Sequence, residues 1–269
     1  MYKQKEIKMK IAILYICTGK YNQFFEDFYK SAMKFFLPSC EKAFFVWTDN
    51  DEIAKDLNNV WMIHKECAGF PMDSLFRFEM FLSVADKLED FDYIYFIQAN
   101  ALFVQPVGLE ILPDESGLAM GIWGGKMLKR PACLYPYERN KKSLAYVAPY
   151  GSNYVYYMGG INGGKSKSYL DMVRTLSANI RDDYNRGIIA KVHDQSHINA
   201  YMRNHTCKII TPEYCWPEEC RSNFEPKMIF RDKVKIDPYF DKGRKHSLIS
   251  KIKKGIIMVV DICRWYLKI

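Results

Sequence analysis

The sequence predicts an α/β fold, with a Rossmann-like mixed sheet flanked by helices in a single domain. A chain of 269 residues is long enough for one large α/β domain with a sizeable core. A composition of 49% apolar and 15% aromatic residues excludes a disordered chain. In the first hundred residues, segments typical of strands and helices follow one another in the order β-α-β-β-α-β.

Each of these elements has its own signal. Runs of aromatic and β-branched residues predict strands at 10–16, 42–49, 60–65 and 91–97. Apolar residues at helical spacing predict helices at 24–36 and 74–88.

A neutral polar break, Gln98-Ala99-Asn100, ends the fourth strand, and a second apolar run, Leu102 to Val104, follows it. Ligands of open α/β sheets bind at the carboxyl ends of the strands. The break is therefore a first candidate for a binding site.

A second candidate is the glycine-rich segment YYMGGINGG, residues 156–164. Two glycine pairs allow a backbone to approach a ligand closely. Residues 159–166 also match the P-loop pattern G-x-x-x-x-G-K-S, which would indicate a nucleotide-phosphate enzyme. A P-loop normally follows the first strand of a domain, whereas this segment lies past the middle of the chain, so we treat the P-loop as the weaker alternative.

The third candidate is the segment VHDQSHINAYMRNH, residues 192–205. His193, Asp194 and His197 have the spacing of metal ligands on one helix face. They also suit hydrogen bonds to a sugar, and for each histidine a structural role is the commoner outcome. Asp194 and Ser196 further resemble a helix N-cap region.

All of the excess positive charge of +8 lies near the C-terminus. Residues 227–269 contain 12 of the 39 Lys and Arg but only 4 of the 31 Asp and Glu, which leaves 27 of each in the first 226 residues. This balance argues against a nucleic-acid-binding protein, and the basic end suggests contact with phosphates or an anionic membrane. Residues 248–269 are too charged to span a membrane, so we expect them to lie in a membrane interface or to dock on the core.

The eight cysteines are scattered and none has CxxC spacing, so a zinc site is not expected. The apolar run near the N-terminus is too short for a secretory signal or a membrane span, and we expect reduced thiols in a cytoplasmic protein.

Three motifs, in order, resemble glycosyltransferase family 6, the family of the ABO blood-group transferases. They are YYMGGINGG, HDQSHINAY at 193–201 and TPEYCW at 211–216. Family members have Tyr-Tyr-x-Gly-Gly-x-x-Gly-Gly, His-Asp-Glu-Ser-His-x-Asn-x-Tyr and Pro-Glu-Tyr-x-Trp. The resemblance covers about residues 10–220 and, without an N-terminal anchor, is closest to the bacterial members.

The resemblance implies the glycosyltransferase-A fold and a retaining reaction. GalNAc or Gal would pass from a UDP-sugar in α-1,3 linkage to the galactose of a fucosylated, H-type oligosaccharide. Thr18 and Tyr21 would contact uracil and ribose, Arg77 the donor sugar, and Asp194 sugar hydroxyls.

The resemblance also assigns specificity. Met158 and Gly160 would choose between GalNAc and Gal, and the missing side chain of Gly160 favours GalNAc because it leaves room for the N-acetyl group. Acceptor recognition would involve Asp194 and the variable loops near Trp123, Tyr137 and Trp216.

Gln98 and Asn100 stand where most members have the Asp-x-Asp motif that holds Mn²⁺. Neutral amides are poor ligands for hard divalent cations, so we expect no metal cofactor. Basic residues of the C-terminal region would then meet the charge of the diphosphate. The candidates are Lys233, Lys235, Lys242, Arg244 and Lys245.

Gln195 stands at the position of the catalytic Glu. A neutral amide stabilises an oxocarbenium-like transition state poorly, so we expect donor binding with reduced turnover. Two explanations remain open: a Glu→Gln variant of an active enzyme, or a natural relative with weak activity. A non-catalytic protein that binds carbohydrate or nucleotide sugar is the alternative function.

The predicted organisation is a catalytic domain at 1–225 and a basic region at 226–269. The basic region would close over the donor and touch the inner face of the membrane peripherally.

Overall fold

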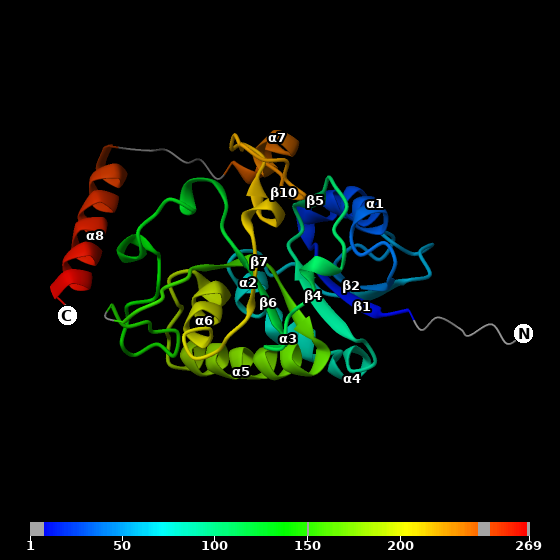
Figure 1. The fold of residues 1–269 in the computed structure, drawn as a ribbon, viewed down its shortest axis with the longest axis horizontal. Helices are drawn as coiled ribbons and strands as arrows, with labels where there is room; N and C mark the ends of the chain where they lie inside the picture. Colours follow the sequence, from blue (N-terminus) through cyan, green and yellow to red (C-terminus); the bar gives the residue numbers. More distant parts are fainter. Residues whose placement is uncertain (1–7, 150, 242–247, 268–269) are drawn as a thin grey trace, which may run out of the picture.

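The computed structural model describes residues 8–149, 151–241 and 248–267. Its centre is a seven-stranded mixed sheet with the order β3-β2-β1-β4-β7-β6-β8 (Figure 1). β1 to β4 are parallel, β7 is antiparallel to both β4 and β6, and β8 is parallel to β6. The strands are β1 (Lys10–Ile16), β2 (Glu41–Thr48), β3 (Val60–His64), β4 (Tyr93–Ile97), β6 (Leu118–Ile122), β7 (Tyr157–Lys165) and β8 (Lys208–Ile210).

Eight α-helices are described. They are α1 (Phe25–Phe35), α2 (Met72–Leu75), α3 (Arg77–Leu82), α4 (Ala85–Leu88), α5 (Ser166–Asn185), α6 (His193–Tyr201), α7 (Lys233–Ile236) and α8 (Leu248–Leu267). Short 3₁₀ turns include η1 (Gly19–Phe24), η4 (Ala132–Leu134) and η6 (Pro238–Phe240).

The four predicted strands are confirmed within one or two residues at each end. The predicted helix at 74–88 is wrong, because the chain there forms α2, α3 and α4 with breaks at Phe76 and Val84. At the second break, the Ser83 hydroxyl donates to the carbonyl of Met80 (2.7 Å). A serine whose hydroxyl bonds a backbone carbonyl of the preceding turn weakens a helix, and so does a β-branched valine. The spacing of apolar residues carries no signal of either effect.

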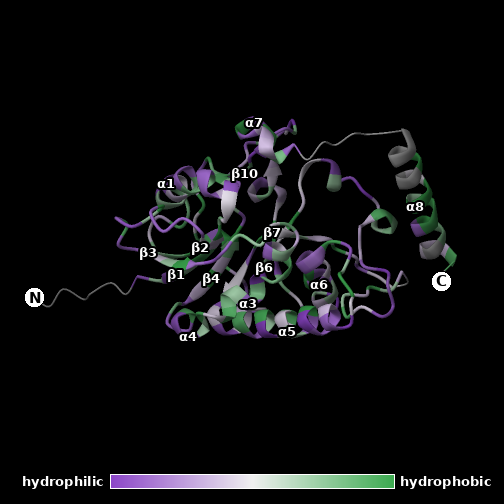
Figure 2. Ribbon diagram, turned by 180° about the vertical axis from the view of Figure 1, so that it is seen from behind, coloured by the Kyte–Doolittle hydropathy of each residue, from purple (hydrophilic) through white to green (hydrophobic). Residues whose placement is uncertain are grey.

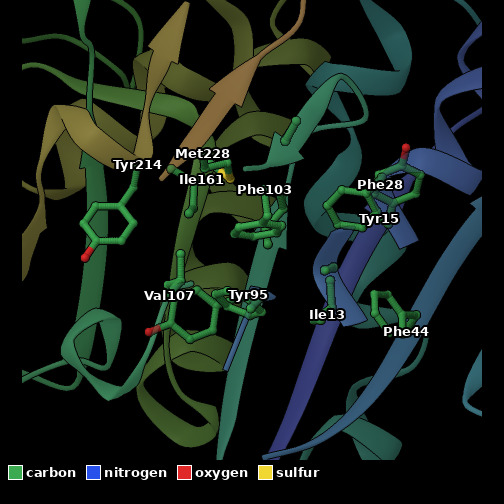
Figure 3. Packing of buried hydrophobic residues seen from close by; sticks show 14 of the residues in the cluster. Ile13, Tyr15, Phe28, Phe44, Tyr95, Phe103, Val107, Ile161, Tyr214 and Met228 are labelled. Carbon is green, nitrogen blue, oxygen red and sulfur yellow. The ribbon is translucent and has the colours of Figure 1, made fainter. Parts of the chain in front are cut away.

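The alternation of side chains along β1 divides the core between the two faces of the sheet. Ile11, Ile13 and Tyr15 pack with α1 on one face, the cluster shown in Figure 3. Ala12 and Leu14 pack with α3, α5 and α6 on the other. Helices on both faces explain why these strands are almost continuously apolar.

A second, three-stranded sheet has the order β5-β10-β9. It consists of β5 (Ala101–Phe103), β9 (Trp216–Pro217) and β10 (Met228–Phe230). β5 begins directly after Asn100, and β10 pairs with it antiparallel. Residues from beyond the predicted boundary at 225 therefore lie beside the polar break, while the division into two regions stays a prediction.

α8 lies at the edge of the molecule, away from the seven-stranded sheet (Figure 1), and the coloured part of this helix in Figure 2 carries hydrophobic residues. Its Trp265 ring lies 4.5 Å from the ring of Tyr154, and Asp261 pairs with Lys191 (3.3 Å). α8 is thus docked through one side. Among the described residues, no helix is long and apolar enough to cross a membrane.

Candidate donor and catalytic site

Strand β7 carries a bulge at its first glycine pair. Met120 of β6 pairs with Asn162, but Ile122 already pairs with Tyr157, so four residues of β7 face one residue of β6. The backbone N–H of Gly159 is therefore outside this ladder, and it donates to Oε1 of Gln195 (2.8 Å). The bulge exposes sheet backbone to side chains of α6.

α6 is held on β7 by side-chain amides. Asn199 accepts from the N–H of Tyr157 (2.9 Å) and donates to its carbonyl (2.8 Å). The helix begins at His193, so the N-cap interpretation of Asp194 and Ser196 is wrong. The Ser196 hydroxyl instead accepts from the N–H of Val192, from inside the helix (2.9 Å).

Gln195 is buried, with 8% of its surface exposed, and both ends of its amide are engaged. Its Oε1 accepts from Gly159, and its Nε2 donates to the hydroxyl of Tyr156 (2.8 Å). A buried amide with both ends bonded has one fixed orientation. The side chain at the predicted catalytic position is therefore preorganised.

Arg77 and Asp194 form a buried ion pair beside Gly159. A Cβ on Gly159 would lie 3.1 Å from Nη2 of Arg77 and 3.4 Å from Oδ2 of Asp194. The guanidinium also lies 4.3 Å from the ring centre of Phe96. Burial raises the pKa of the Asp194 carboxyl, and the charge of Arg77 opposes the rise.

The two histidines of α6 do not converge with Asp194. The His193 ring packs edge-on against Phe70, and burial lowers its pKa. His197 faces Asp183, with 3.5 Å between Nε2 and Oδ2, and burial lowers its pKa to about 4. Among the described residues, no group of three His, Cys, Asp or Glu side chains could hold a metal ion. The metal-site interpretation of this segment is wrong, and the structural role of His197 holds.

The P-loop alternative is also wrong, because residues 157–165 form strand β7 and not a loop around a phosphate. The glycines serve close packing within the sheet. A Cβ on Gly163 would collide with the ring of Tyr95, and one on Gly164 with the carbonyl of Gly117.

Gly160 has crowded surroundings. A Cβ there would lie 2.6 Å from Cε of Met158, 2.9 Å from Oε1 of Gln98 and 3.0 Å from the ring of Phe230. The Gly160 carbonyl accepts from the N–H of Gln98 (2.8 Å). The structure therefore brings Gln98, Met158 and Gly160 together where β4 and β7 meet.

Asn100 is tied to the C-terminal region. Its Nδ2 donates to the backbone carbonyl of Arg231 (2.8 Å). The backbone carbonyl of Asn100 accepts from the N–H of Arg231 (2.8 Å). Its Oδ1 is buried and has no partner among the described residues. Gln98 and Asn100 thus offer amide oxygens and no carboxylate, a donor set that does not fit Mn²⁺ or Mg²⁺.

The predicted uridine-contact residues adjoin the basic C-terminal region. Lys233 donates to the hydroxyl of Tyr21 (2.9 Å), and Phe240 packs on the Tyr21 ring with 4.9 Å between ring centres. Thr18 is buried and donates to Asp73 (3.1 Å). Arg244, Lys242 and Lys245 lie outside the described residues.

The predicted acceptor residues differ in their surroundings. Trp123 lines a cavity of about 50 Å³. Trp216 is buried, and its indole N–H donates to the carbonyl of Cys220 (2.9 Å). The Tyr137 hydroxyl likewise donates to the carbonyl of Val155 (2.8 Å). Trp123 is therefore the one of the three that lines this cavity.

Sequence reasoning assigned no role to Tyr156, although it binds Gln195 and lines the same cavity as Trp123. The available signal was the Tyr-Tyr pair before the glycines, since neighbouring strand residues face opposite sides. Tyr156 lines the cavity and binds Gln195, whereas Tyr157 joins the core cluster of α3, α5 and α6.

The seven-stranded mixed sheet flanked by helices, with polar groups gathered where β4 and β7 meet, is a glycosyltransferase-A-like fold. The chain belongs to glycosyltransferase family 6, whose family model matches residues 1–236.

Relatives agree with this assignment. The chain is 37% identical over 234 residues to the O-antigen biosynthesis glycosyltransferase WbnI of Escherichia coli, covering 86% of this chain and 98% of that protein. It is 27% identical to globoside alpha-1,3-N-acetylgalactosaminyltransferase 1 of Gallus gallus, covering 79% of this chain and 63% of the relative. It is 26% identical to histo-blood group ABO system transferase 1 of Rattus norvegicus, covering 78% and 61%. The match spans less than two thirds of the two vertebrate enzymes.

Proposed function

We propose that this family 6 glycosyltransferase moves GalNAc, or alternatively Gal, from a UDP-sugar to the galactose of a fucosylated, H-type oligosaccharide. The linkage formed is α-1,3, and the anomeric configuration is retained. The observation that carries the proposal is the group of buried polar side chains around Gly159.

This group has unused hydrogen-bonding capacity. Nε of Arg77 has no hydrogen-bond acceptor among the described residues, whereas Nη2 is paired with the Asp194 carboxylate. Buried donors without acceptors are rare in folded proteins. The Arg77 guanidinium lies beside the Asp194 carboxylate and beside Gly159, which has no side chain to block a ligand. This arrangement suits the hydroxyls of a sugar.

The preference for GalNAc rests on Gly160. Cε of Met158 and Oε1 of Gln98 fill the space that a side chain of Gly160 would take, so the N-acetyl group enters there when the flexible Met158 side chain turns aside. The N-acetyl group would contact Met158 at this position.

The test is transfer to a fucosylated galactoside, with UDP-GalNAc and UDP-Gal compared at equal concentration. We expect UDP-GalNAc to give the higher kcat/KM and the new bond to be α-1,3 by NMR. Transfer of neither sugar to any fucosylated or unfucosylated galactoside would contradict the proposal.

We further propose that transfer needs no metal ion and that Lys233 helps to hold the diphosphate. Lys233 lies beside Tyr21, a predicted uridine contact, and the amides of Gln98 and Asn100 do not suit a divalent cation. Arg244 is a second candidate from the same basic region.

Activity should therefore survive EDTA. Lys233→Ala should raise the Kd for UDP, whereas Lys167→Ala, which changes an exposed lysine of α5, serves as the control. Loss of activity in EDTA that Mn²⁺ restores would overturn the metal-independent mechanism.

Turnover in this chain should be low because Gln195 is neutral. The alternative is a non-catalytic relative that only binds carbohydrate or nucleotide sugar. UDP release above the buffer background, with donor alone or with acceptor, separates the two functions.

We also propose that the protein is cytoplasmic and contacts the inner face of the membrane through α8. Exposed apolar residues recur at helical spacing on this helix, at Ile252, Ile256, Val259 and Tyr266. Trp265 and Asp261 are used for docking on the other side. Co-sedimentation with anionic vesicles, compared with neutral vesicles, tests this contact, and equal or absent binding to both contradicts it.

A further inference from the structure

Tyr156 links the predicted catalytic position to the cavity next to it. It is 5% exposed, its oxygen accepts from Gln195, and its ring stacks with that of Tyr135 at 5.5 Å. Both tyrosines line the cavity of about 50 Å³, and the walls also include Trp123. No residue of this cavity wall carries a charge.

The direction of the Gln195–Tyr156 hydrogen bond follows from the backbone. The N–H of Gly159 can only donate, so the amide atom facing it at 2.8 Å must be the oxygen of Gln195. The amide nitrogen then faces Tyr156. Flipping the amide would place its NH₂ group against the N–H of Gly159 and lose that bond.

The Tyr156 oxygen therefore accepts, and its own hydrogen is left for another partner. No described residue accepts that hydrogen within bonding distance. Burial raises the pKa of the phenol well above its usual range, so the hydrogen is present at neutral pH. A buried hydroxyl hydrogen without an acceptor costs free energy unless a ligand or water takes it up.

A carboxylate at position 195 would reverse this arrangement. Carboxylates only accept, so Tyr156 would have to donate its hydrogen to residue 195. With a glutamate at position 195, the hydroxyl hydrogen of Tyr156 would be bonded to that residue. With Gln195, the same hydrogen is available to a ligand.

We propose that Tyr156 is a specificity-determining residue that donates a hydrogen bond to a hydroxyl of the neutral acceptor sugar at the mouth of this cavity. The inference rests on the proposed transferase function for the identity of the sugar. An uncharged, partly aromatic wall suits the apolar face of a pyranose and not a diphosphate. At roughly 10–15 Å³ for each water molecule, a cavity of about 50 Å³ holds a few waters and only part of a pyranose ring, so the sugar would sit at its mouth.

The test measures equilibrium binding of a fucosylated galactoside in the presence of UDP, which needs no turnover. In the Gln195 background, Tyr156→Phe should weaken acceptor binding about three- to tenfold, the effect of one neutral hydrogen bond. In the Gln195→Glu background, the same change should have no effect on acceptor affinity, because the hydrogen is already committed. Gln195→Glu alone should weaken acceptor binding by a similar factor.

Tyr135→Phe is the matched control, since it removes a hydroxyl from the same cavity without touching Gln195. Its effect on affinity should be the same in both backgrounds. A Tyr156→Phe effect that is absent, or equal in both backgrounds, would overturn the inference. If no galactoside binds to any form, the proposed acceptor fails instead, and thermal melting of each variant verifies that it is folded.

Discussion

Replacing Gln195 by Glu should restore fast transfer. The change preserves the shape of the side chain, so the carboxylate keeps the hydrogen bond from Gly159 and gains one from Tyr156, whose hydroxyl only needs to rotate. The position is 92% buried, where a charge acts on the developing positive charge of the sugar with little screening. One preorganised electrostatic group lowers a barrier by roughly 2–4 kcal/mol, which corresponds to about 30- to 900-fold in kcat.

The assay is UDP release from UDP-GalNAc with and without acceptor, at saturating donor. The matched control is Asn204→Asp, which adds the same charge on the exposed turn after α6 and should leave kcat unchanged. The Kd for UDP should change little in Gln195→Glu. A rate with acceptor equal to that of the chain with Gln195 would refute the catalytic role of this position.

Further predictions concern the neighbouring groups. Asp194→Asn should lower the free energy of unfolding by about 3–5 kcal/mol in urea titration, because it leaves Arg77 buried without a counter-charge; a loss no larger than that of the exposed Asp171→Asn would contradict this. His197 has a folded pKa of about 4. Since this lies below the unfolded value, protonation favours unfolding, and stability should fall by roughly 3 kcal/mol as the pH drops from about 6.5 to about 4. His197→Gln should flatten that part of the stability–pH curve, and an unchanged slope would argue against it. Gly160→Ala should reduce transfer of GalNAc more than transfer of Gal, and an equal loss for both donors would remove Gly160 from donor selection.

Periodicity predicted four of the seven strands of the large sheet, whereas the site remains a prediction. The strand at 10–16 was predicted residue for residue, since a continuous apolar run buried on both faces leaves few alternatives. The helix at 74–88 was not, because breaks at Phe76 and Val84 depend on local hydrogen bonds and not on apolar spacing. Neither the bulge of β7 nor its bond to Gln195 has a signature in sequence. Both depend on a register shift between two strands that are more than thirty residues apart in the chain.

The segment Gln98-Ala99-Asn100 also separates what the sequence predicts from what only the structure shows. Sequence comparison identified Gln98 and Asn100 as the uncharged counterpart of a metal motif. Only the structure shows that Asn100 is bound to the backbone of Arg231 through two hydrogen bonds, and that Lys233 is bonded to Tyr21. Contacts between residues more than a hundred positions apart cannot be read from spacing.

The most direct test of the central claim is the product formed from UDP-GalNAc and a fucosylated galactoside in the presence of EDTA, analysed by NMR. We predict a single trisaccharide-type product with a new α-1,3 linkage, formed slowly by the chain with Gln195 and faster by Gln195→Glu. A β-linked product, or no product from either form with or without Mn²⁺, would contradict a retaining family 6 transferase built on this site.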